Sequence, residues 1–97
     1  MKNIITAAII AMAATAAQAD PTIDFAECVA SRVAVENGST LEAARAAFPA
    51  ATRKAEINLA IMANSYLDLP ANVKPQGLVL MLTNIPQSAA CLHILEN

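Results

Sequence analysis

Residues 50–67 read AATRKAEINLAIMANSYL, and no glycine or proline interrupts them. Apolar side chains recur here at steps of three and four residues, which is the spacing of one face of an α-helix. That face consists of Ala55, Leu59, Met62, Ala63, Tyr66 and Leu67, and Ile57 and Ile61 lie on an adjoining face. The stretch predicts the most strongly patterned helix of the chain.

Upstream of this stretch, residues 22–36 predict another helix. A single stripe at helical spacing carries Phe25, Cys28 and Val29. We expect Thr22 or Asp24 near the N-terminal cap of this helix. The pair Asn37-Gly38 follows as a helix stop.

A short helix is predicted between that stop and Pro49. Ser39 and Glu42 have the spacing of a capping box, in which the hydroxyl and the carboxylate each accept a hydrogen bond from the other residue's backbone N–H. Pro49 disfavours helical backbone at Phe48, so we expect the helix to end or kink there. Its apolar side is formed by Leu41, Ala44, Ala47 and Phe48.

Downstream, residues 68–77 predict a loop or a short helical turn. Residues 78–82 are a continuous apolar run, and periodicity alone does not assign such a run to helix or strand. Its leucines and methionine, in place of mostly β-branched residues, favour a helix. Pro86 is suited to the first position of a final helix over residues 87–95.

These segments predict an all-α fold, a small bundle of four to five short helices. Alanine supplies 15 of the 78 residues from Asp20 onward, and its small side chain lets helices approach closely. The aromatic residues Phe25, Phe48 and Tyr66 are expected to fill the core.

Residues 1–19 have the pattern of a secretory signal peptide. Lys2 gives the positive start, residues 4–17 are apolar apart from Thr6 and Thr15, and Ala17-Gln18-Ala19 offers a small-residue cleavage site. We predict cleavage between Ala19 and Asp20, which leaves residues 20–97 as a single domain. The expected location is the periplasm or the medium, with no membrane insertion after processing.

The charges of residues 20–97 argue against nucleic acid as a partner. Five basic and eight acidic side chains remain, the basic ones are scattered, and no aromatic residues alternate with them. Nucleic-acid-binding surfaces cluster lysine and arginine, and single-strand binders add aromatic stacking platforms. The pattern is typical of a solvated exterior.

Cys28 and Cys91 are the two cysteines of the chain. In an oxidising compartment we expect them to form one disulfide, which links the first and last helices. An intermolecular disulfide and two free thiols are the alternatives. A closed loop of this length would restrict the unfolded chain strongly.

No catalytic, cofactor-binding or metal-binding residue is predicted, and we expect a non-enzyme. Cys91 and His93 are two apart, so on a helix they point in different directions. His93 and Glu96 alone make a poor zinc site. Asp24 and Glu27 share a helix face, but lie near a helix N-terminus that favours the ionised form of both.

The second half of the chain resembles a known family over residues 57–91. The residues that carry the resemblance are the segment IMANSYLDLP (61–70), the run LVLML (78–82), Pro86 and Cys91. This pattern is similar to the C-terminal part of the Rap/Tai immunity proteins. The resemblance implies a small secreted α-helical protein with disulfides that neutralises type VI secretion amidase effectors in the periplasm.

The sequence therefore favours a protein-binding module, an immunity or inhibitor protein that acts on an effector enzyme by direct binding. The alternative is a periplasmic acid-stress or general chaperone that binds client proteins. The partner-binding residues are not predicted, although the loop 66–72 is one acidic candidate. A homodimer stays open.

Overall fold

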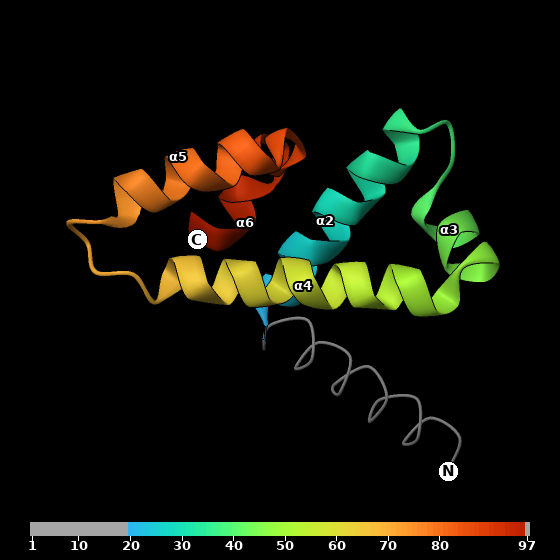
Figure 1. Ribbon diagram of the computed structural model, residues 1–97, viewed down its shortest axis with the longest axis horizontal. Coiled ribbons are helices and arrows are strands. Elements are labelled where there is room, and N and C mark those ends of the chain that lie inside the picture. Colours follow the sequence, from blue (N-terminus) through green and yellow to red (C-terminus); the bar gives the residue numbers. More distant parts are fainter. Residues whose placement is uncertain (1–19, 97) are drawn as a thin grey trace, which may run out of the picture.

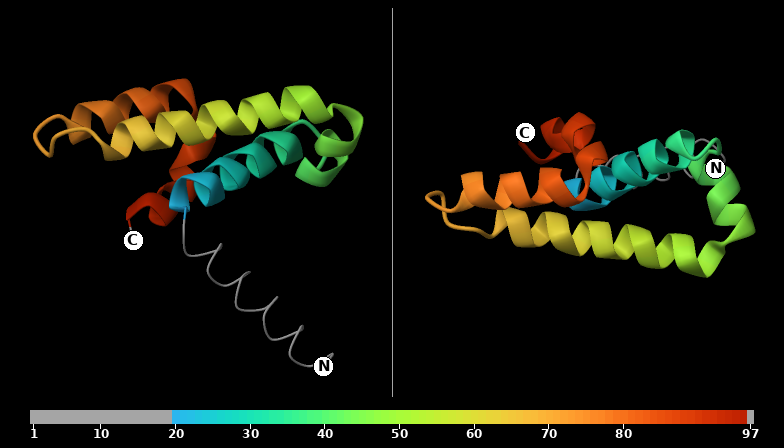
Figure 2. Two further views of the ribbon diagram at one scale, coloured as in Figure 1. Left: turned by 90° about the horizontal axis from the view of Figure 1, so that it is seen from below. Right: turned by 45° about the horizontal axis from the view of Figure 1, so that its top comes forward.

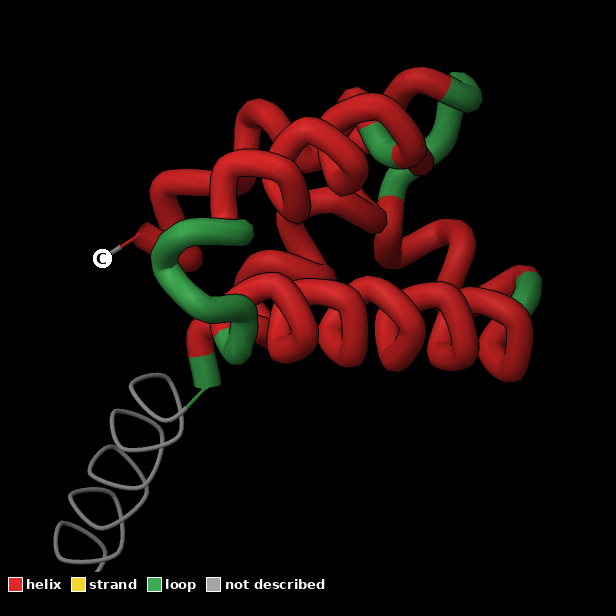
Figure 3. Tube along the Cα trace, turned by 60° about the vertical axis from the view of Figure 1, so that its left-hand side comes forward, coloured by secondary structure: helices red, strands yellow, loops and turns green. Residues whose placement is uncertain are grey.

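The computed structural model describes residues 20–96, and their regular structure is entirely helical (Figure 3). The elements are α2 (Pro21–Glu36), α3 (Leu41–Ala47), α4 (Pro49–Leu67), α5 (Lys74–Asn84), the 3₁₀ helix η1 (Pro86–Cys91) and α6 (Leu92–Glu96). The all-α prediction is confirmed. The predicted signal peptide lies outside the described residues.

The long helix α4 is the base of the molecule, and the other helices are arranged along it (Figure 1). Helix α2 crosses α4 and rises away from it, while the short α3 joins the separated ends of the two helices. Helix α5 runs back beside the second half of α4, and η1 with α6 returns the chain onto α2 (Figure 2). The arrangement gives α4 different neighbours in its two halves.

Helix α2 begins at Pro21, one residue earlier than predicted. Its N-cap is Asp20, whose carboxylate accepts hydrogen bonds from the backbone N–H and the hydroxyl of Thr22, and Pro21 occupies the first helical position. Thr22 and Asp24 therefore lie in the first turn of the helix, and Thr22 lies near the cap as expected, although the sequence did not identify Asp20 as the cap itself. Proline at the first helical position was the signal that points to Asp20.

The predicted stop after α2 is confirmed at Gly38. This residue has φ +77°, a conformation that glycine adopts without the steric cost of a side chain. The N–H of Gly38 donates to the carbonyl of Val35 over 2.9 Å, and that of Ser39 donates to Ala34 over 2.8 Å. These two bonds form a Schellman motif, which satisfies the last carbonyls of the helix.

The cap of α3 differs from the prediction. Thr40 is the N-cap, and its hydroxyl accepts a hydrogen bond from the N–H of Ala43 over 3.0 Å. Ser39 instead donates to the carbonyl of Thr40. The predicted capping box of Ser39 and Glu42 is therefore wrong by one residue. Ser39 and Thr40 both carry a hydroxyl that can cap a helix, and with Thr40 as the cap the third residue after it is Ala43, which has no carboxylate to complete a capping box.

The C-terminal part is helical, as expected, with shifted boundaries. The apolar run 78–82 lies inside α5, which begins earlier, at Lys74. Pro86 is the first residue of the next element, as predicted, but residues 86–91 form a 3₁₀ helix before α6 begins. The hydroxyl of Ser88, which is fully buried, donates to the carbonyl of Ile85.

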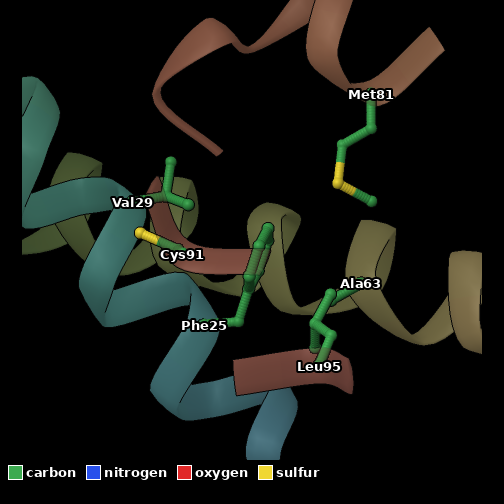
Figure 4. Packing of buried hydrophobic residues seen from close by; sticks show 6 residues of the cluster. All are labelled: Phe25, Val29, Ala63, Met81, Cys91 and Leu95. Atoms are coloured by element: carbon green, nitrogen blue, oxygen red, sulfur yellow. The ribbon is translucent and has the colours of Figure 1, made fainter. Parts of the chain in front are cut away.

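The hydrophobic core lies where α2, the second half of α4, α5 and the C-terminal segment meet (Figure 4). Its buried members are Phe25, Val29, Ala63, Met81, Cys91 and Leu95. Phe25 is fully buried at the centre, as the sequence predicted. Helix α3 contributes no buried residue, and α4 contributes only Ala63, so the core occupies one end of the molecule.

A disulfide fastens this packed end. Cys28 of α2 is bonded to Cys91 at the end of η1, with 5.9 Å between the Cα atoms and a sequence separation of 63 residues. The predicted bridge between the first helix and the C-terminal helical segment is confirmed, and neither cysteine is a free thiol. No helix in residues 20–96 is long and apolar enough to cross a membrane.

Candidate binding cleft

An apolar cleft of about 520 Å³ opens between α2, α3 and α4, at the end of the molecule away from the core. Figure 1 shows the arrangement of these three helices at that end of the molecule. Its large apolar lining residues are Val33, Leu41, Phe48 and Leu59, and alanines from all three helices complete the walls. A hollow of this size, open to solvent and lined by apolar groups, is the default candidate for a binding site.

The cleft exists because the facing side chains are too small to fill it. Helices α2 and α4 diverge from their crossing point, where Asn64 donates to the hydroxyl of the buried Thr22. Beyond that point half of the residues that line the cleft are alanines: Ala30 and Ala34 on α2, Ala43, Ala44 and Ala47 on α3, and Ala51 and Ala55 on α4. Alanine stabilises each helix but leaves the space between them empty.

Phe48 lies on the rim of this cleft and is 68% exposed. Phe48 is both the C-cap of α3 and the N-cap of α4, with φ −135° and ψ 68°. Pro49 excludes helical backbone at the residue before it, which explains the break between the two helices. The expectation that Phe48 fills the core is therefore wrong, and the side chain is presented to solvent.

The cleft has few polar groups and no charged lining residue. Asn37, Ser39 and Thr52 are its polar members. The hydroxyl of Thr52 already donates to the carbonyl of Ala44 over 3.1 Å, which fixes α3 to α4. The walls therefore accept an apolar, uncharged group.

An ion cluster connects the three helices that line the cleft. Arg45 of α3 contacts Glu27 of α2 over 2.9 Å and also forms an ion pair with Glu56 of α4. The Glu56 side chain is only 18% exposed, whereas Arg45 and Glu27 are about half exposed. Hydrogen bonds to Glu56 first, and then to Glu27, raise the pKa of the Arg45 guanidinium above its ordinary value.

The other residues weighed in the sequence are exposed, disulfide-bonded or ion-paired. His93 and Glu96 are exposed on α6, and Cys91 is buried in the disulfide. Within residues 20–96, no group of three or more His, Cys, Asp or Glu side chains is placed to hold a metal ion. Glu27 is engaged with Arg45, so the carboxylate has a structural partner.

A second apolar surface lies on α5. Val79 and Leu80 are 62% and 63% exposed, and Pro75 and Gln76 lie beside them. Lys74 is the one charged residue of α5, and residues 78–82 are all apolar. Whichever face of the helix packs on the core, the opposite face therefore leaves large apolar side chains in solvent. The candidate segment 66–72 consists of the last two residues of α4 and the turn that follows, and the ammonium of Lys74 lies 5.9 Å from the ring centre of Tyr66.

Comparisons of this chain with protein-family models, with curated proteins and with solved structures find no match.

Proposed function

We propose that this chain is a non-enzymatic protein-binding module that holds an apolar segment of a partner protein in the cleft between α2, α3 and α4. The observation that supports this proposal most directly is the cleft itself, an unfilled apolar hollow with the exposed Phe48 on its rim. Aromatic side chains that enter a partner's pocket are frequent anchors of protein interfaces. Phe48 is the anchor in this proposal.

The division of the molecule supports this role. The disulfide and the core hold one end rigid, while the helices at the other end leave their apolar faces uncovered. The rigid end holds α2 and α4, two of the walls of the cleft, in a fixed arrangement, and a preorganised wall loses less conformational entropy when the partner binds. The small size of the domain is therefore compatible with tight binding.

A peptide segment suits the cleft better than a small polar metabolite. Small-molecule sites combine apolar walls with a few convergent polar groups that fix the orientation of the ligand. Here Thr52 is bonded to Ala44, and no charged side chain lines the walls. The alanine-lined walls leave room for apolar side chains of a protein segment.

Within this class, we propose an immunity or inhibitor protein that neutralises an effector enzyme by direct binding. The resemblance of residues 57–91 to the Rap/Tai immunity proteins supports the assignment, and the signal-like residues 1–19 support a periplasmic location. The disulfide is compatible with an oxidising compartment.

The test is affinity capture of tagged residues 20–97 with a pair of matched variants. Ala47 lines the cleft, whereas Ala46 is its exposed neighbour in the last turn of α3 and lies outside the lining. We expect Ala47→Asp to abolish capture of one stoichiometric enzyme partner, because the bound partner would bury the new carboxylate without a pairing group, and Ala46→Asp to retain it. Equal capture by both variants would refute the role of the cleft.

A general chaperone is the second candidate, and the observation that favours it is the additional apolar surface of α5. Large apolar side chains are exposed on several helices: Ile23, Val35, Ile57, Ile61, Val79 and Leu80. Many substoichiometric clients in the capture experiment, with suppression of client aggregation at low pH, would favour this function over immunity.

A further inference from the structure

Helix α3 has few buried apolar contacts, and polar contacts link it to both neighbouring helices. It has no buried residue, and its apolar side faces the open cleft. Its side chains and carbonyls make two kinds of contact with the neighbouring helices: the ion pairs of Arg45 with Glu27 and Glu56, and the hydrogen bond from Thr52 to Ala44. An element with few buried apolar contacts opens locally at low free-energy cost.

The surroundings of Arg45 make these contacts sensitive to pH. Glu27 of α2 faces it from one side, and Glu56 and Arg53 of α4 face it from the other, all around one shallow hollow. A carboxylate in general loses its negative charge in acid, whereas a guanidinium group stays charged. Arg45 then loses its two partners and keeps a cationic neighbour, so attraction is replaced by repulsion.

We propose that α3 is a lid on the cleft and that the cluster of Glu27, Arg45 and Glu56 is an acid-sensitive latch for this lid. At neutral pH the latch holds α3 against α2 and α4. In acid the latch opens, α3 moves away, and the alanine-lined walls of α2 and α4 are exposed to larger apolar segments. The disulfide keeps the packed end folded during this change.

This inference rests on the proposed function in taking the cleft as the binding surface, and its test needs no partner. The probe is Nile red, a neutral dye whose fluorescence rises on apolar surfaces and which does not respond to the net charge of the protein. The variant Glu27→Gln/Glu56→Gln removes the latch without acid. The control Asp68→Asn/Glu96→Gln removes the same number of charges from exposed residues outside the hollow.

For the wild-type chain, we expect dye binding to increase about fivefold between neutral pH and about pH 3.5, as the carboxylates are protonated. The latch variant binds the dye strongly at neutral pH and changes little in acid, whereas the control follows the wild type. Hydrogen exchange locates the effect, with faster exchange in α3 and unchanged protection in α2 and α6.

Wild-type pH dependence in the latch variant would overturn the proposal, and so would an acid response that exposes α2 and α6 together with α3. A salt titration gives a second reading without mutation. At neutral pH, about 1 M salt screens the more exposed Arg45–Glu27 pair most strongly and should accelerate exchange in α3 alone. Unchanged hydrogen exchange of α3 in salt would overturn the latch. A partner that is captured equally by the wild type and by Ala47→Asp would instead overturn the role of the cleft in binding.

Discussion

Loss of the bridge between Cys28 and Cys91 is expected to lower the free energy of unfolding by about 4 kcal/mol. The bridge closes a sequence separation of 63 residues, and the chain-entropy relation for a loop of that length gives about 4 kcal/mol at room temperature. A domain of this size has a total stability of only about 5–15 kcal/mol. The reduced chain is therefore expected to be marginally folded.

Urea unfolding of residues 20–97, followed by far-UV circular dichroism with and without reductant, measures this effect. With a slope of about 1 kcal/mol per molar urea, the midpoint should fall by about 4 M on reduction. The variant Cys28→Ala/Cys91→Ala should unfold like the reduced chain and should not respond to reductant. If reduction moves the wild-type midpoint by less than about 1 M, the reasoning that the bridge holds the packed end together is wrong.

Four further predictions concern single residues. Phe25→Ala should lower the free energy of unfolding, measured with urea, by about 3–5 kcal/mol, because it empties the centre of the core. Phe48→Ala should change the free energy of unfolding by less than about 0.5 kcal/mol but should reduce the amount of partner that affinity capture recovers. Gly38→Ala should cost about 1 kcal/mol in the same unfolding assay, because the left-handed backbone at this position disfavours a side chain. The hydrogen bond from the Thr22 hydroxyl lowers the pKa of the Asp20 carboxyl. The stability that this cap contributes is therefore present above the pKa of Asp20 in the unfolded chain and is lost as pH falls through its pKa in the folded chain. The variant Asp20→Asn should lose less stability than the wild type below about pH 4, and an unchanged pH profile of stability would contradict this.

The helices were predictable because their signals are local. The spacing of apolar residues in 50–67 and the stop at Gly38 depend only on neighbours in sequence, and both match the structure. The disulfide was predictable for a different reason, since two cysteines allow one intramolecular pairing. The caps at Asp20 and Thr40 were missed because adjacent residues offer equivalent side-chain acceptors.

The cleft was not predictable, because it depends on what is missing between helices. Phe48 has the helical spacing of a core residue on the apolar side of its segment, and the sequence pattern does not show that half of the residues lining the cleft are alanines. The latch was hidden for a similar reason. Glu27 and Glu56 lie 18 and 11 residues from Arg45, and only the crossing of the helices brings them together.

The central claim, that the cleft binds an apolar segment of a partner protein, is tested most directly by site-specific photocrosslinking. A photoreactive phenylalanine analogue replaces Phe48 in one sample and Arg32, an exposed residue of α2 outside the cleft lining, in another. The proposal predicts that position 48 forms one crosslinked product with the protein that affinity capture recovers, and that position 32 forms none. Capture of that protein without a crosslink at position 48, or with equal crosslinking at both positions, would contradict it.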